Sequence, residues 1–208
     1  MIDKHRKIIF IHIPKTAGVY IDQTFGWPTD RPRGRHYGPK KYKAYWNDEY
    51  YKFTFVRNPY DRFISSYFFH RNRFIKKKRR RRRASSAQRI TTAISQMARA
   101  YTVEQWFDAC VKNSFITTIH LHLQYLFVKS YEYNFIGKFE NLHKDLAKVF
   151  RDNKLPKYNQ LPPANTTKHE HYSHYFRNVK FQDKFYDYFE RDFETFDYPY
   201  SLEKGINS

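Results

Sequence analysis

The sequence contains a single cysteine, Cys110, among its 208 residues, so an internal disulfide is excluded. It also lacks any apolar run that approaches about 18 residues, which argues against a membrane-spanning helix. Residues 1–7 are rich in charge and lead straight into a candidate strand, with no pattern typical of a signal peptide. These absences predict a cytoplasmic protein, unless the chain is the trimmed domain of a lumenal one.

Acidic residues are scarce as well. There are 20 Asp and Glu against 39 Lys and Arg, which gives a net charge of +19. Eight basic residues are consecutive, at 76–83, and without them the balance is 31 against 20, or +11, so the rest of the chain is also basic. This balance suits anionic ligands. Because like charges repel, we expect a mobile, solvated insertion at 76–87; contact with an anionic glycan, a nucleic acid or a membrane surface is the alternative.

Glycine is limited to six residues, and its placement matters in the segment KIIFIHIPKTAG at 7–18. An apolar strand runs into a short loop there, and a helix is expected at 19–25. The loop amides and the positive end of the helix favour an anion, to which Lys15 adds a charge and Thr16 a hydroxyl. The loop is not a Walker A loop, because its glycine, Gly18, follows the lysine. A plain connection with a solvated lysine is the alternative.

A second segment, FTFVRNPYDRFISSY at 53–67, repeats the order of strand, turn and helix. Arg57 is expected at the carboxyl end of its strand, the edge at which ligands bind in open α/β sheets. Its planar guanidinium can grip a phosphate with two hydrogen bonds. Ser65 follows roughly two helical turns later and can reach the same anion. A structural ion pair for Arg57 and helix packing for Ser65 are the alternatives.

The remaining pattern predicts an α/β fold with a central parallel sheet flanked by helices, in a single domain at 1–208. Further strands are expected at 52–56 and 133–137, and helices at 39–46, 60–73, 87–100, 103–112 and 142–152. Thr102 and Gln105 have the spacing of a capping box. Phenylalanine recurs every four residues in a final helix and predicts one buried face, at Phe181, Phe185, Phe189 and Phe193.

Five separated segments resemble the sulfotransferases, in that family's order. FIHIPKTAG is similar to their 5′-phosphosulfate loop, and FTFVRNPYDRFISSY to their 3′-phosphate segment. FIGKFENLHKDL, LPPANTTKHEHYSHYF and YDYFERDFETFDY resemble later parts of the branch that contains the chondroitin and heparan sulfate enzymes and soluble bacterial relatives. The resemblance implies a P-loop-like fold of three layers.

The resemblance also implies a reaction. The donor would be 3′-phosphoadenosine 5′-phosphosulfate (PAPS), and the acceptor a hydroxyl of a carbohydrate, either anionic or neutral. A tyrosine or a small alcohol is the alternative acceptor. Lys15 would stabilise the leaving phosphate, and His36, between the two motifs, would be the general base. No metal, nucleic acid or membrane span is implied. The nucleotide would be held by Pro14, Lys15, Thr16, Ala17, Gly18, Arg57, Ser65, Thr166, Thr167 and Lys168.

Other polar residues are given structural roles. His12 is expected to be a packed strand residue, and Glu140 to cap the helix that follows it, with orientation of a site group as the alternative for Glu140. The alternative for His36 is an exposed loop histidine, and that for Lys168 is a solvated side chain. Several later histidines occur in pairs or threes, but a zinc site needs three or four converging ligands, and the single cysteine adds no support.

Two other functions compete with sulfuryl transfer. A nucleotide kinase would need a glycine-rich Walker A loop and a Walker B acid, and neither is found. A polyanion-binding protein would depend on the basic run at 76–83 rather than on Lys15. Nothing in the sequence fixes the acceptor.

Overall fold

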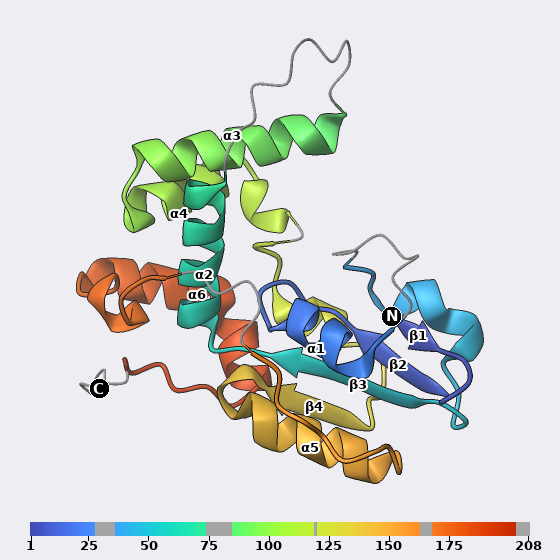
Figure 1. Ribbon diagram of the computed structural model, residues 1–208. Coiled ribbons are helices and arrows are strands. Elements are labelled where there is room, and N and C mark those ends of the chain that lie inside the picture. Colours follow the sequence, from blue (N-terminus) through green and yellow to red (C-terminus); the bar gives the residue numbers. More distant parts are fainter. Residues whose placement is uncertain (28–35, 74–84, 119, 163–167, 203–208) are drawn as a thin grey trace. The chain divides into compact units, whose positions relative to one another are not determined.

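The computed structural model describes residues 1–27, 36–73, 85–118, 120–162 and 168–202 (Figure 1). The chain forms two compact units that alternate along the sequence. The first unit comprises Met1–Pro59, Leu123–Thr166 and Arg191–Tyr198; the second comprises Tyr60–His122, Thr167–Glu190 and Pro199–Ser208. Because the chain passes repeatedly from one unit to the other, this division does not test the single-domain prediction. Of the expected basic insertion at 76–87, residues 76–84 lie outside the described residues, whereas Ser85 caps a helix that begins at Ser86, so the end of the insertion was predicted too late.

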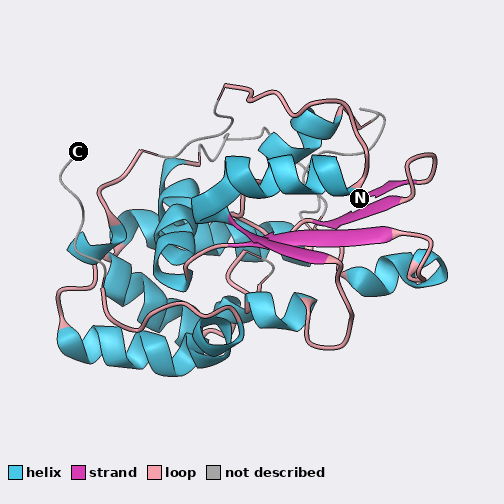
Figure 2. Cartoon of the chain, turned by 90° about the horizontal axis from the view of Figure 1, so that it is seen from below, coloured by secondary structure: helices cyan, strands magenta, loops and turns pink. Residues whose placement is uncertain are grey.

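The first unit is built on a sheet of four strands in the order β1-β2-β3-β4 (Figure 2). The strands are β1 (Ile2–Asp3), β2 (Ile8–Ile11), β3 (Tyr51–Val56) and β4 (Phe135–Lys138). β2 pairs with β3 and β3 with β4 in parallel, with Phe10 opposite Phe53 and Thr54 opposite Ile136. The α/β class is therefore confirmed, and three of the strands are parallel as predicted.

The edge strand β1 differs from the prediction, because it is antiparallel to β2 and makes the sheet mixed. Only four residues separate the two strands, and a parallel connection needs a crossover of a dozen or more. The turn is stabilised by Asp3, whose Oδ1 accepts hydrogen bonds from the amides of His5 (3.0 Å) and Arg6 (2.9 Å). The charged amino-terminal segment is thus a hairpin rather than a lead into the first strand.

Side chains alternate between the two faces of the sheet, as a strand requires. Ile8 and Phe10 of β2 pack on one face with α1 (Gly18–Phe25) and α5 (Leu142–Asp152). Ile9 and Ile11 pack on the other face with the 3₁₀ helix η1 (Pro39–Tyr45) and with Phe127 and Phe196. The aromatic-rich sequence therefore fills a core on both sides of the sheet.

Helices make up the second unit. They are α2 (Pro59–Asn72, which enters this unit at Tyr60), α3 (Ser86–Ala100), α4 (Val103–Lys112) and most of α6 (Val179–Thr195). Aromatic rings fill their interface: Phe63 lies 5.0 Å from Trp106 and 5.1 Å from Phe185 between ring centroids. The four predicted phenylalanines of α6 are each at most 2% exposed, so the stripe is core, as expected.

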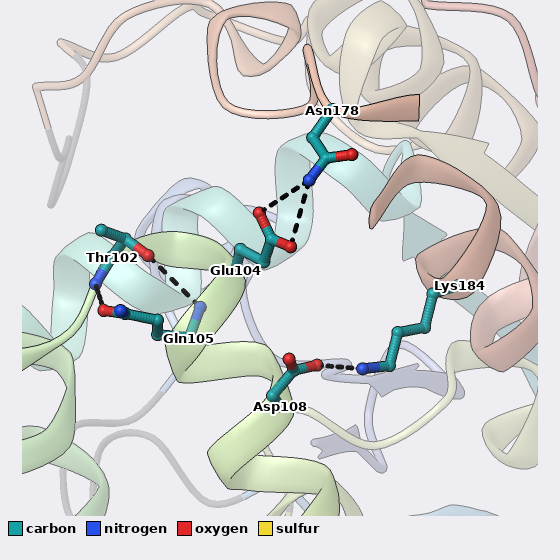
Figure 3. A network of polar contacts seen from close by, with 6 residues as sticks. All are labelled: Thr102, Glu104, Gln105, Asp108, Asn178 and Lys184. Carbon is teal, nitrogen blue, oxygen red and sulfur yellow. Dashed lines mark hydrogen bonds and ion pairs between the residues drawn. The ribbon is translucent and has the colours of Figure 1, made fainter. Parts of the chain in front are cut away.

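Polar contacts join α4 to the beginning of α6 within this unit (Figure 3). The predicted capping box is present, since Thr102 accepts from the amide of Gln105 and the Gln105 side chain accepts from the amide of Thr102. Asn178 donates to both oxygens of Glu104 at 3.2 Å. One turn further along α4, Asp108 pairs with Lys184.

Short 3₁₀ helices link the longer elements, and they are η2 (Phe115–Thr117), η3 (Gln124–Phe127), η4 (Phe139–Asn141) and η5 (Tyr172–His174). The predicted helix at 39–46 is also of this type: Pro39 begins it, and Tyr42 has non-helical backbone angles inside it. Among the described helices, none combines the length and the apolar character that a bilayer span requires.

Candidate functional site

The loop between β2 and α1 has an unusual backbone (Figure 1). Lys15 and Ala17 adopt the left-handed region, with φ of 70° and 63°, although neither is glycine. When consecutive residues alternate between right-handed and left-handed backbone conformations, their N–H groups point to the same side. They then form a concavity that can bind an anion. Ala17 is the N-cap of α1 and has no side-chain acceptor for the first amides of that helix. These backbone angles suit the anion-binding loop that the sequence predicts; the binding itself stays a prediction.

Thr16 supports this loop from inside. It is fully buried, and its Oγ1 donates a hydrogen bond to the carbonyl of Ile13 at 2.9 Å. The hydroxyl thus closes the loop through an internal hydrogen bond, and a contact between the backbone amide of Thr16 and an anion stays a prediction.

Arg57 lies at the same edge of the sheet as this loop. β2 and β3 are adjacent and parallel, so their carboxyl ends meet. The Nη1 of Arg57 donates to the carbonyl of Lys15 at 3.1 Å, and its guanidinium stacks over the ring of Phe139, with Cζ 4.0 Å from the centroid. The two motifs predicted from the sequence are therefore in direct contact.

The electrostatics of this edge favour an anion. Burial, and secondarily the positive charge of Arg57, lowers the pKa of Lys15 from 10.5 to about 8. Two cationic side chains that are brought this close repel each other, and a multiply charged anion between them would remove that cost.

His36 lies beside the same loop. Its Nδ1 is 3.2 Å from the carbonyl oxygen of His12, and the two imidazole rings are 4.3 Å apart in an edge-on arrangement. A carbonyl can only accept, so Nδ1 must carry the hydrogen in this contact. In the neutral ring the basic lone pair is then on Nε2.

His12 is packed, as expected, although it lies just beyond the end of β2. Its ring stacks with Phe10 at 5.9 Å and occupies the space above Gly18. A Cβ at position 18 would be 1.8 Å from the His12 Cδ2. Gly18 is therefore required by the packing of His12, and this is a reason that the motif alone does not reveal.

The backbone of Arg57 is held by a side chain for which no functional role was predicted. The side chain of Gln124 accepts from the amide of Arg57 at 2.9 Å and donates to its carbonyl at 2.8 Å. Gln124 is itself bound by Asp192. Weak signals were present: Gln124 interrupts an apolar run, and Asp192 falls on the phenylalanine face of the last helix.

The expected capping role of Glu140 is wrong. Its Oε1 accepts from the amide of Asn58 at 2.7 Å, and its Oε2 accepts from the hydroxyl of Tyr198 at 2.9 Å. The residue after Arg57 is thus also held by a side chain. Glu140 lies one residue before the N-cap of α5, and its carboxylate is used by these long-range contacts instead.

The other predicted nucleotide contacts are not in this cluster of the first unit. Ser65 is buried in α2 and Lys168 is exposed, and both belong to the second unit. Thr166 and Thr167 lie outside the described residues, whereas Pro14 is in the loop itself. Within the part of the chain that the structure describes, no three His, Cys, Asp or Glu side chains are grouped so that they could hold a metal.

A family model described as the sulfotransferase family matches residues 1–199. No curated protein and no solved structure matches the chain significantly.

Proposed function

The chain belongs to the sulfotransferase family, and we propose that it transfers a sulfuryl group from PAPS to a hydroxyl of a carbohydrate acceptor. Transfer of a sulfuryl group follows from the family; the donor, the acceptor and the residue roles are our proposal. The observation that carries it is the contact between the Lys15 loop and Arg57. Two basic groups at the ends of adjacent parallel strands suit a ligand with two anionic ends, and PAPS is such a ligand.

The residues present fit this donor. The amides of residues 16–18 would hold the 5′-phosphosulfate, with Pro14 shaping the loop before them. The guanidinium of Arg57 would grip the 3′-phosphate. The nucleotide contacts that the resemblance implies for Ser65, Thr166, Thr167 and Lys168 stay predictions. A P-loop-like arrangement of three layers, with α1 starting at the phosphate, accords with the packing on both faces of the sheet.

In the proposed reaction the acceptor oxygen attacks sulfur while the bond from sulfur to the bridging oxygen breaks. The electron pair of that bond moves to the 5′-phosphate, where the charge of Lys15 stabilises it. The proton of the acceptor hydroxyl passes to His36 Nε2, since Nδ1–H faces the His12 carbonyl. The products are a sulfate ester and adenosine 3′,5′-bisphosphate.

An anionic carbohydrate is the acceptor class that the charge favours. The chain carries +19, and three lysines of η1, which begins three residues after His36, are exposed: Lys40, Lys41 and Lys43. Positive charge near the base would attract a substrate that already bears carboxylate or sulfate groups.

The test is transfer of labelled sulfate from PAPS to a panel of glycans. Lys15→Ala and Arg57→Ala should abolish detectable transfer, and His36→Ala should reduce it about 10²- to 10⁴-fold. Lys7→Ala is the matched control for Lys15, because Lys7 is exposed and also has a left-handed backbone, with φ of 53°. His5→Ala is the control for His36. Full activity in Lys15→Ala, or no transfer by the unaltered protein to any hydroxyl, would refute the proposal.

A further inference from the structure

Gln124 is a buried polar side chain with an unusually complete bonding pattern. It is 0% exposed, and its amide group bridges both backbone groups of one residue, Arg57, which is 67 positions away. A carboxamide can accept from an N–H with its oxygen and donate to a C=O with its nitrogen at once, whereas an ionised carboxylate cannot donate and a hydrocarbon can do neither. A glutamine at position 124 therefore satisfies both backbone groups of Arg57, the residue that follows β3.

Gln124 is in turn fixed by Asp192, which is also 0% exposed. The two carboxylate oxygens of Asp192 accept from the amides of Gln124 (2.9 Å) and Tyr125 (2.8 Å), the first two residues of η3. A carboxylate at the start of a helix satisfies amides that have no partner within the helix. The start of η3 is thus anchored to the last turn of α6, and all these residues belong to the first unit.

The result is that Arg57 is clamped before any ligand arrives. Its amide and carbonyl are held by Gln124, and the next amide is held by Glu140. The guanidinium then meets the Phe139 ring and the Lys15 carbonyl. An arginine whose backbone is fixed loses less conformational entropy when it binds an anion.

We propose that Gln124, anchored by Asp192, is a positioning residue that pre-orients Arg57 for the anionic nucleotide. This inference rests on the proposed function, in which Arg57 binds the 3′-phosphate. Gln124 does not touch the nucleotide in this scheme; it acts through the backbone of Arg57. The alternative is that the bridge only stabilises the fold, in which case its loss changes stability but not the affinity of folded molecules.

The variant Gln124→Glu separates the two roles by pH. When the introduced carboxyl is ionised, it places an oxygen against the Arg57 carbonyl and the bridge fails. When it is protonated, it can donate to that carbonyl and accept from the amide, so the bridge returns. The charged groups that face this bridge, Arg57, Lys15, Glu140 and Asp192, are the same in both proteins, so the ratio of the two dissociation constants isolates the introduced carboxyl.

The experiment measures the dissociation constant of adenosine 3′,5′-bisphosphate by calorimetry from pH 5.5 to 8.5. We expect Gln124→Glu to bind about tenfold more weakly than the unaltered protein at pH 8.5, with the ratio falling toward one at pH 5.5. Gln124→Met should bind weakly at every pH. Asp192→Asn should weaken binding less than Gln124→Met does. The double variant Gln124→Met/Asp192→Asn should have nearly the same dissociation constant as Gln124→Met alone, because both residues act on Arg57 through one chain of contacts.

Two controls complete the design. Gln105→Glu makes the same chemical change in the capping box of α4, where the side chain only accepts, and should bind normally. Arg57→Lys should weaken binding at all pH values. If Arg57→Lys weakens binding but Gln124→Glu and Gln124→Met match the unaltered protein, the positioning role is overturned and the proposed function stands. If the unaltered protein does not bind the nucleotide, both are refuted.

Discussion

At the scale of single residues, Lys15 carries its charge in a place that disfavours it. Its pKa is about 8 in the folded protein and 10.5 in the unfolded chain. Between these values the unfolded chain binds more protons than the folded one, so this group makes stability rise with pH across that window. Below about pH 8 the lysine is protonated in both states, so the whole cost of burying its charge is subtracted from the free energy of unfolding.

Lys15→Met should therefore stabilise the protein while it abolishes transfer. At pH 7 we expect the free energy of unfolding to rise by roughly 1 kcal/mol, which allows for the partial exposure of the side chain. The gain should shrink as pH approaches 10. Urea unfolding at several pH values measures this. Lys7→Met should leave stability nearly unchanged, and a Lys15→Met protein less stable than the original at pH 7 would contradict the interpretation.

Gly18→Ala should destabilise the protein by about 1–3 kcal/mol, because the added methyl overlaps the His12 ring. Transfer should also fall, since His12 contacts His36. Removing the ring in the double variant His12→Ala/Gly18→Ala should restore part of the lost stability. A double-mutant cycle from thermal unfolding gives the coupling energy, and strictly additive effects would show that the two residues do not compete for space.

The proximity of Lys15 and Arg57 could be predicted because each lies within four residues of the end of a short apolar strand, and parallel strands bring such ends together. Gln124 and Asp192 could not be predicted, because their contacts with Arg57 and with each other span 67 and 68 positions. Local sequence shows a polar residue in an apolar setting, but only the packed fold shows which backbone group it satisfies.

At the scale of elements, helices with strong periodicity or caps were predicted well. The α4 capping box and the phenylalanine face of α6 are both present. Elements set by a few residues were not: β1 has two residues, too few for any periodic signal, and η1 contains a break at Tyr42. Short elements depend on turns and tertiary packing rather than on pattern.

The α4 cap gives a prediction that separates stability from function. Thr102→Ala removes the acceptor for the Gln105 amide and should cost about 1 kcal/mol of stability. Thr102→Ser keeps the hydroxyl and should lose little. Transfer per folded molecule should be unchanged in both variants. Thermal unfolding with parallel activity assays checks this, and a loss of activity at temperatures where Thr102→Ala is fully folded would assign the helix a further role.

At the scale of the whole molecule, the binding of an anion should be coupled to the uptake of protons from solution. A bound dianion next to Lys15 should raise the pKa of that lysine, so the complex should take up protons near pH 8.5. Calorimetry with adenosine 3′,5′-bisphosphate in two buffers of different ionisation enthalpy measures the uptake. Lys15→Arg keeps the charge but does not titrate, and its uptake should vanish; equal uptake in both proteins would point to another group.

Ligand binding should also stabilise the whole fold. Nucleotide at about 100 times its dissociation constant adds about 2.7 kcal/mol to the free energy of unfolding. Arg57→Ala should lose most of the corresponding thermal shift at the same nucleotide concentration, and Arg6→Ala should retain it.

The anchoring of Arg57 by a carboxylate far along the chain has a consequence for biosynthesis. A ribosome makes Lys15 and Arg57 well before Asp192, whose carboxylate holds Gln124. A nascent chain can therefore pair β2 with β3 before the anchor of Arg57 is complete. Premature termination after residue 190 would keep Lys15, Arg57 and Gln124 and still leave the arginine without its anchor.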